Sequence, residues 1–254
     1  MLKEIVIAIQ SYYKAHHFIR EHKLWKWIII PGIVYTILFI VSMYFFGTTA
    51  NHFIEWLSLK TGLKTWLDKQ GSGLLRFLFA FAGIILWLIQ MLFYFSLFKY
   101  FWLIVGSPVF AYLSERTDSI ISNKSFEFNK KQFIKDIFRG MWIAIRNTLW
   151  QSVYMISILL LSLIPVAGWL TPLLALLIEC YYYGFSMLDY SLERKKFTAA
   201  ESIYFIGNHK GLAIGNGLMF YLMHILPFVG WVLAPAYAVI AATLSLQEVP
   251  EATK

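Results

Sequence analysis

The stretch Ile164-Pro-Val-Ala-Gly-Trp169 and its counterpart Leu226-Pro-Phe-Val-Gly-Trp231 share the motif Pro-x-x-Gly-Trp. Each copy lies near the middle of a long, almost uncharged run, and a second proline, Pro172 or Pro235, follows it. Proline breaks a helix because it lacks the amide donor and clashes with the preceding turn. The motif therefore predicts that the chain twice enters an apolar medium, turns there and returns.

The composition indicates that this medium is a membrane. Of the 254 residues, 59% are hydrophobic and only 14% are charged, whereas a soluble domain has about 25% charged residues. Aromatic side chains flank many of the apolar runs, as interfacial anchors do. We therefore predict an all-α integral membrane protein with a single membrane domain over residues 1–254.

Two apolar runs are long enough to cross a bilayer. Residues 27–47 are 21 uncharged residues, which as a helix cover about 30 Å, the thickness of one bilayer core. Residues 74–105 form a second run of 32 residues. The intervening loop, residues 48–73, is more polar and contains turn signals such as Gly71-Ser-Gly73. We expect two full transmembrane helices.

The runs that contain the motif have shorter arms. They extend over about residues 152–188 and 212–246, and the arm before each break has about 14 residues, or roughly 21 Å of helix. This length falls short of a bilayer core of about 30 Å. We expect two helical hairpins that penetrate part of the membrane. Two full spans per hairpin would need a thinner bilayer or very short turns, and this alternative stays open.

Two further segments have amphipathic patterns. Apolar side chains share one face of residues 2–22: Ile5, Ile9, Tyr12 and Tyr13. Residues 130–146 repeat apolar side chains every three or four positions. We expect residues 2–22 to lie in the plane of the membrane interface, with a soluble N-terminal cap as the alternative, and residues 130–146 to pack on the protein or on the bilayer surface. We expect residues 106–149 to form a cytoplasmic helical portion.

The placement of basic residues predicts the orientation. Segments 1–26, 106–149 and 189–211 hold five, seven and four Lys or Arg residues, whereas the two Pro-x-x-Gly-Trp turns hold none. By the positive-inside rule, both termini are cytoplasmic, and the hairpins enter from the cytoplasmic side. The net charge of +8 is therefore attributed to cytoplasmic loops, and no nucleic acid partner is expected.

The sequence contains no motif of an enzyme. The six histidines show no metal-ligand spacing with Cys, Asp or Glu, and no Walker loop or Gly-x-Ser-x-Gly motif is present. We therefore expect no enzymatic activity, no cofactor and no metal. The glycine-rich residues 207–217 are interpreted as a turn with close helix packing.

Several ionisable residues are candidates for a functional site. Glu179 lies within an apolar run, where a carboxylate is costly, so it is either functional or paired with a basic group across the bundle. Lys23 and Lys26 precede the first span, either as an oxyanion site at a helix N-terminus or as flanking positive-inside charge. Further side chains could form a polar network at the membrane mouth or remain solvated charges: Glu115, Arg116, Asp118, Arg139 and Arg146.

The order of several short motifs resembles a known family. They are a basic turn before Trp27-Ile-Ile-Ile-Pro31, Gly106-Ser-Pro-Val-Phe-Ala-Tyr-Leu-Ser-Glu115, Lys135-Asp-Ile-Phe-Arg139, Ile164-Pro-Val-Ala-Gly168, Leu188-Asp-Tyr190, Leu226-Pro227 leading to Pro235, and Ala241-Ala-Thr243. This pattern resembles the CysZ sulfate permease family, which shares a domain with the etoposide-induced membrane proteins of eukaryotes.

The resemblance implies a multi-pass protein of the bacterial inner membrane that admits sulfate for cysteine synthesis. It also implies two full membrane helices, two pairs of partly penetrating helices and a homo-oligomer in contact with membrane lipids. The family binds sulfate at a Gly-x-Arg-Arg turn, which matches Lys23-Leu-Trp-Lys26 here, so Lys26 falls on the second arginine. The turn lacks the paired guanidinium forks that bind an oxyanion bidentately.

Within the same resemblance, Glu115 and Asp118 correspond to family acidic positions, and Arg139 falls on a family arginine. The sequence therefore favours a permease for a small oxyanion, with sulfate as the first candidate. Lys23 and Lys26 would bind the substrate, while Glu115, Asp118, Arg139, Arg146 and Glu179 would line the path. The alternative is a membrane scaffold or lipid-interacting protein that transports nothing, which the amphipathic segments would also suit.

Overall fold

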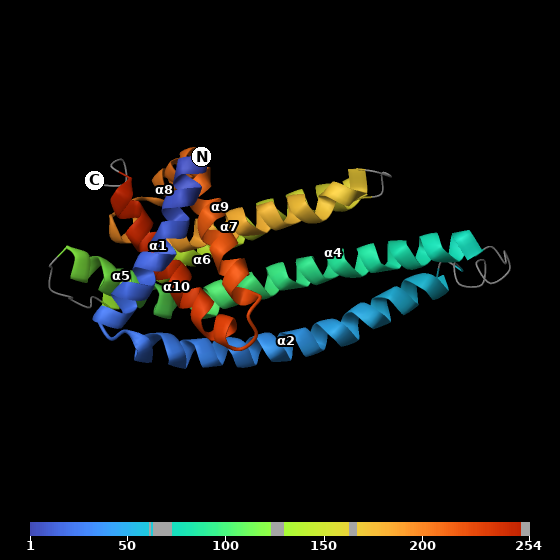
Figure 1. The fold of residues 1–254 in the computed structure, drawn as a ribbon, viewed down its shortest axis with the longest axis horizontal. Coiled ribbons are helices and arrows are strands. Elements are labelled where there is room, and N and C mark those ends of the chain that lie inside the picture. Colours follow the sequence, from blue (N-terminus) through green and yellow to red (C-terminus); the bar gives the residue numbers. More distant parts are fainter. Residues whose placement is uncertain (61, 63–72, 123–129, 163–166, 250–254) are drawn as a thin grey trace. The chain divides into compact units, whose positions relative to one another are not determined.

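The computed structural model of the chain describes every residue except 61, 63–72, 123–129, 163–166 and 250–254. The described residues form helices and turns, and none of them forms a strand (Figure 1). The α-helices are α1 Leu2–Glu21, α2 Trp25–Lys60, α4 Gly73–Val105, α5 Ser107–Ile121, α6 Lys130–Ser162, α7 Thr171–Arg194, α8 Ala199–Asn208, α9 Lys210–His224 and α10 Val229–Ser245. Two 3-10 helices, η1 Ala167–Leu170 and η2 Leu246–Glu248, precede α7 and follow α10.

Three helical segments within the described residues are long and apolar enough to cross a membrane: Trp25–Ala50, Gly168–Arg194 and Val229–Glu248. The first corresponds to the predicted span at residues 27–47. Together with the helical content, this confirms the prediction of an all-α membrane protein. The second predicted span, residues 74–105, is part of α4, a helix of 33 residues.

Helix α2 continues past its apolar run to Lys60, so the prediction that residues 48–60 belong to a loop is wrong. These residues contain no glycine or proline. The hydroxyl groups of Thr48 and Thr49 donate to the carbonyl of Phe45 over 2.9 and 2.7 Å, which accommodates polar side chains within a helix. The next glycine, Gly62, has a φ of 64°, which a continuing helix cannot adopt.

The chain divides into two compact units. One unit is the helical pair of residues Ile37–Phe98, in which aromatic rings of α2 and α4 meet. These contacts are Phe39 with Phe95 and Phe98, and Phe46 with Trp87 and Tyr94. The other unit combines Met1–Thr36 with Lys99–Lys254 and contains all the predicted site residues. A single membrane domain over residues 1–254 stays a prediction.

Helix α7 is the central helix of the larger unit. Nearly every side chain from Glu179 to Glu193 is buried, and α5, α6, α9 and α10 pack around this helix. Two glycines bring the backbones of α7 and α9 into contact. A Cβ atom at Gly184 would lie 1.9 Å from the Ala213 carbonyl oxygen, and one at Gly217 would lie 2.0 Å from that of Cys180. The predicted close packing of residues 207–217 is therefore confirmed.

The second Pro-x-x-Gly-Trp motif forms the tight connection between α9 and α10. Phe228 has φ 59° and ψ −62°, and the Val229 amide donates to the Pro227 carbonyl over 2.7 Å. This is a γ-turn with positive φ, a strained conformation. The indole of Trp231 donates to the His224 carbonyl over 2.9 Å. The motif thus closes the hairpin and supplies a donor to a carbonyl at the end of α9.

Of the first motif, the structure describes Ala167, Gly168 and Trp169, which belong to η1. Residues 164–166 lie outside the described residues, and Trp169 is 78% exposed. The preceding helix, α6, has 33 residues, so the predicted boundary between an amphipathic helix at 130–146 and a short arm from about 152 is wrong. No glycine or proline interrupts residues 146–152.

Helix α9, the arm before the second motif, has 15 residues and therefore the predicted short length. How deeply either hairpin enters a bilayer stays a prediction.

Helix α1 confirms the helix predicted at residues 2–22, but with a different buried face. The side chains that pack inward are Ala8, Ser11, Tyr12, Ala15 and Ile19. They lie against α9 and α10. Tyr13, which was expected to share the face of Tyr12, is 70% exposed. One face of α1 therefore packs on the protein, because small residues on that face allow close approach to α9.

We expect Gly217→Val to prevent stable folding, because the added side chain would overlap the α7 backbone. The measurements are the yield of monodisperse protein in detergent and its Tm. Gly207→Ala is the matched control, since no atom lies within 4 Å of a Cβ added there. That control should keep or slightly raise the Tm. A wild-type Tm for Gly217→Val would show that the α7–α9 contact is dispensable.

Candidate functional site

The turn between α1 and α2 carries the two predicted substrate-binding lysines. Lys23 has a φ of 52°, and the Leu24 amide donates to the Ile19 carbonyl over 3.1 Å, as in a Schellman motif. Leu24 and Ile19 are buried, whereas Lys23 and Lys26 are exposed. The turn thus presents two cations beside the first amide groups of α2, where an anion is stabilised.

Arg139 of α6 reaches buried carboxylates on α7. Its terminal nitrogens donate to Asp189 over 3.1 and 2.9 Å, which is a bidentate pair. Its Nη2 also donates to the Ser202 hydroxyl over 2.7 Å, and Glu193 lies 3.6 Å from Nη1. The side chains of Asp189 and Glu193 are 3% and 5% exposed. These contacts tie α6, α7 and α8 together inside the protein.

A chain of charged side chains connects Arg139 to Glu115 of α5. Glu193 lies 3.7 Å from Arg194, and Arg194 lies 3.4 Å from Glu115. The structure therefore joins two residues of the predicted network through side chains that the sequence reasoning did not select. The sequence contains a pattern that could have identified two of these side chains. Asp189 and Glu193 are four residues apart, on one helix face, at the end of an apolar run.

Asp118, also on α5, lies close enough to Lys195 for their charges to interact. Burial lowers the pKa of Lys195, and the negative charge of Asp118 opposes that decrease. Asp118 therefore faces the same end of α7 as Glu115 does.

Arg146 forms a separate contact between α6 and α7. It lies seven residues beyond Arg139, which corresponds to about 10 Å of helix. Its Nη1 donates to Asn147 Oδ1 over 3.0 Å, and its guanidinium carbon lies 6.0 Å from the centre of the Phe185 ring. The predicted single network at the membrane mouth is thus divided, with Arg146 away from the Arg139–Glu115 chain.

Glu179 lies nearer the hairpin tip and is 1% exposed. Gln151 of α6 donates from Nε2 to one carboxylate oxygen. Tyr221 of α9 donates to the other over 2.8 Å. Both oxygens are therefore hydrogen-bonded, as a buried carboxylate requires. These two donors are neutral side chains on two neighbouring helices. The predicted pairing of Glu179 with a basic group across the bundle stays a prediction.

These contacts form a polar strip between two packed helices, which we call the α6–α7 seam. It has three levels: Arg139 with Asp189, Arg146 with Phe185, and Gln151 with Glu179. The positive groups of the seam thus lie on α6 and its carboxylates on α7, and both helices otherwise carry many apolar side chains. Lys23 and Lys26 lie outside the seam, on the α1–α2 turn.

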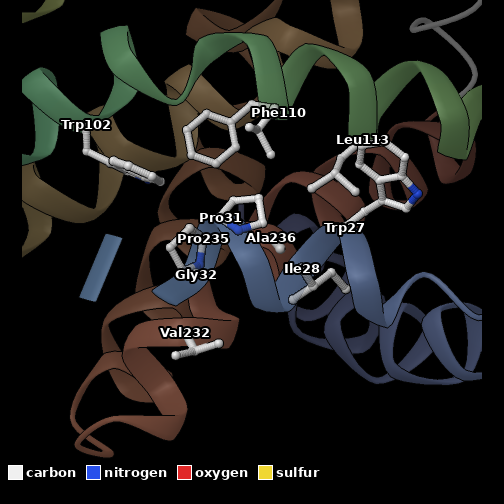
Figure 2. Close-up of a pocket in the computed structure, with 11 residues that line it drawn as sticks. Trp27, Ile28, Pro31, Gly32, Trp102, Phe110, Leu113, Val232, Pro235 and Ala236 are labelled. Atoms are coloured by element: carbon white, nitrogen blue, oxygen red, sulfur yellow. The ribbon is translucent and has the colours of Figure 1, made fainter. Parts of the chain in front are cut away.

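An apolar pocket lies where α2 meets α5 and α10. Figure 2 shows Pro31 and Gly32 of α2 beside Pro235 of α10, with Trp102 at one side. A Cβ atom at Gly32 would lie 2.1 Å from the Val232 carbonyl oxygen, so only glycine fits this crossing. The lining residues carry no charge, so this pocket is unsuited to an oxyanion.

Within the described parts of the chain, no three His, Cys, Asp or Glu residues are grouped as a metal site requires.

Comparison with known proteins relates the chain to a described family and to a curated relative. A family model described as "Sulfate transporter CysZ/Etoposide-induced protein 2.4" matches residues 12–235. A curated protein from Pseudomonas syringae pv. tomato (strain ATCC BAA-871 / DC3000), described as "Sulfate transporter CysZ", is 25% identical over 143 residues. That alignment covers 56% of this chain and 56% of the relative, so the chain matches little more than half of its relative's length.

We expect Asp189→Asn to destabilise the protein strongly, because it removes the bidentate partner of the buried Arg139 guanidinium. Removing one member of a buried ion pair costs about 3–5 kcal/mol, which should lower the Tm in detergent by several degrees or more. Lys14→Gln is the matched control, since Lys14 pairs with Glu248 at an exposed position and should change the Tm little. Equal Tm values for both variants would contradict a stabilising role for Asp189.

Proposed function

The chain belongs to the family described as Sulfate transporter CysZ/Etoposide-induced protein 2.4, and from this premise we propose that it passes sulfate, or a related small oxyanion, across the bacterial inner membrane. The observation that carries the proposal is the family match over residues 12–235, which includes every proposed site residue. The name of the Pseudomonas relative supports sulfate as the substrate. Imported sulfate would supply cysteine biosynthesis.

The proposed path begins at Lys23 and Lys26. Exposed cations at a helix N-terminus attract anions from solution and raise their local concentration. The path then follows the charged chain near α5 and the α6–α7 seam. The residues proposed to line it are Glu115, Asp118, Arg139, Arg146 and Glu179.

The pairing of opposite charges supports permeation in preference to tight binding. Arg139 is neutralised by Asp189 and Glu193, and Arg194 by Glu115 and Glu193. An anion is therefore not held tightly at either arginine, and the attraction that conduction also requires comes in this proposal from Lys23 and Lys26. The proposed transport needs no covalent step.

The proposed setting is a multi-pass protein with both termini in the cytoplasm, assembled as a homo-oligomer among membrane lipids. The distribution of Lys and Arg supports this orientation. Exposed apolar side chains are distributed along the whole length of α6, including its more polar first half. They are Ile134, Phe138, Trp142, Ile145, Leu149, Val153, Ile156 and Leu160. Such a surface requires lipid or a second copy to cover it.

Radiolabelled sulfate uptake into proteoliposomes tests the proposed function. We expect uptake above that of protein-free vesicles, with competition by unlabelled sulfate. Flux equal to that of protein-free vesicles at several pH values would contradict transport and favour the alternative of a scaffold or lipid-interacting protein.

Charge at the α1–α2 turn should matter most at low ionic strength. We expect Lys26→Gln to raise the KM for sulfate several-fold in dilute buffer and much less in 0.5 M salt, where the Debye length is only about 4 Å. Lys23→Gly separates charge from conformation, because glycine adopts the positive φ without strain. That variant should keep the Tm and raise the KM. An unchanged KM for both variants would remove these lysines from the path.

A further inference from the structure

Arg146 differs from the other charged residues of the α6–α7 seam in its partners. Within the described parts of the chain, no Asp or Glu lies at ion-pair distance from its guanidinium, whereas Arg139 and Arg194 each contact carboxylates. Its hydrogen bond goes to the neutral Asn147 amide, and its face lies over the Phe185 ring. A half-buried guanidinium with neutral neighbours retains positive potential that an anion can use.

Asn147, next to Arg146, has a buried amide donor without a hydrogen-bond partner among the described residues. Its side chain is completely buried, and its Nδ2 has no hydrogen-bond partner among the described residues. Its Oδ1 already accepts from Arg146, so the unused donor lies beside the guanidinium. Buried donors are nearly always hydrogen-bonded in folded proteins. The unused donor therefore points to an acceptor that the described residues do not provide.

Two tyrosines of α7 complete the surroundings. The Tyr181 ring lies 6.1 Å from the Phe185 ring, over which Arg146 lies, and the charge of Arg146 acts on the hydroxyl groups of both Tyr181 and Tyr182. Their rings are 5.1 Å apart, and the Tyr182 ring lies 6.3 Å from that of Tyr154 on α6. A phenol is protonated at neutral pH and donates a hydrogen bond.

We propose that Arg146, Asn147 Nδ2 and the hydroxyl groups of Tyr181 and Tyr182 form an interior binding site for a tetrahedral oxyanion, between the Arg139 and Glu179 levels of the seam. This site deepens the proposed function and rests on it. The exposed lysines attract the anion, and the Arg146 site receives it after its water has been removed.

The donor set indicates the class of anion. Arg146 and Asn147 Nδ2 can only donate. Sulfate and selenate present only acceptor oxygens, whereas hydrogen phosphate must also donate one hydrogen bond. A tyrosine hydroxyl can donate or accept, so hydrogen phosphate would use one of the two hydroxyl groups as an acceptor and lose it as a donor. The site therefore favours sulfate and selenate, which can receive a hydrogen bond from every donor.

The flanking carboxylates would limit how long the anion stays. Asp189 and Glu193 mark one adjacent level of the seam and Glu179 marks the other. Their negative charges oppose occupancy on either side of Arg146. The geometry thus combines one attractive position with two repulsive neighbours, as a site that must release its ligand requires.

The first experiment measures initial sulfate uptake by the full chain in proteoliposomes, for wild type, Arg146→Lys, Arg146→Gln and the exposed control Arg20→Gln. We expect Arg146→Gln to raise the KM at least tenfold, Arg146→Lys to have a smaller effect, and Arg20→Gln to match wild type. The increase at Arg146 should persist in 0.5 M salt, unlike that at Lys26. Wild-type uptake with an unchanged KM in Arg146→Gln would overturn the site and leave the proposed function intact.

The second experiment uses Asn147→Asp, which preserves side-chain size and gives Arg146 the carboxylate that it lacks. We expect this variant to keep or raise the Tm of the detergent-solubilised protein and to lose most of its sulfate binding by titration calorimetry. Selenate should compete with sulfate, and phosphate should compete less. Sulfate affinity equal to wild type in a folded Asn147→Asp variant would overturn the site.

Calorimetry also separates the two proposals. Sulfate binding that depends on Arg146, in a protein that does not transport, would support the site and contradict the proposed function. Absence of both binding and transport in the folded wild-type protein would overturn both.

Discussion

The burial of charge on α7 is the constraint on which the larger unit depends. Glu179, Asp189 and Glu193 lie on a helix that is almost enclosed by its neighbours. Removing an ion from water costs several kcal/mol unless it is paired and hydrogen-bonded. In an apolar surrounding the partners must come from the protein itself. For these carboxylates they come from α6, α8 and α9. Glu115 of α5 pairs with Arg194, which also belongs to α7. These contacts contribute to the positions of the four helices around α7.

Close backbone packing and buried polar contacts support each other in this unit. Gly184 and Gly217 allow α7 and α9 to touch, and this approach places Tyr221 within 2.8 Å of Glu179. Larger residues would separate the helices by more than a hydrogen bond can span. The glycines therefore contribute to the polar seam, although neither has a side chain that could take part in it. The same principle operates at Gly32, where α2 meets α10.

The family relationship and the geometry address different questions. Membership makes oxyanion transport the natural proposal, whereas the geometry distinguishes the charged residues from one another. Arg139 is enclosed by carboxylates and holds three helices together, while Arg146 faces neutral donors. Lys23 has the left-handed backbone that glycine adopts without strain, so this position combines a structural requirement with a charge. Arg139, Arg146 and Lys23 are all basic, but each has a different physical role.

The sequence by itself determined the membrane class, the helical content, the first span and the turn at the second Pro-x-x-Gly-Trp motif. These features follow from local quantities: apolar run length, residue spacing, and the positions of proline and glycine. Only the tertiary structure decided that α6 is one continuous helix and that Glu193 and Arg194 connect Arg139 with Glu115. Arg139 and Asp189 are 50 residues apart, and their contact depends on the relative register of two helices. Residues distant in sequence meet through packing, which no local pattern specifies.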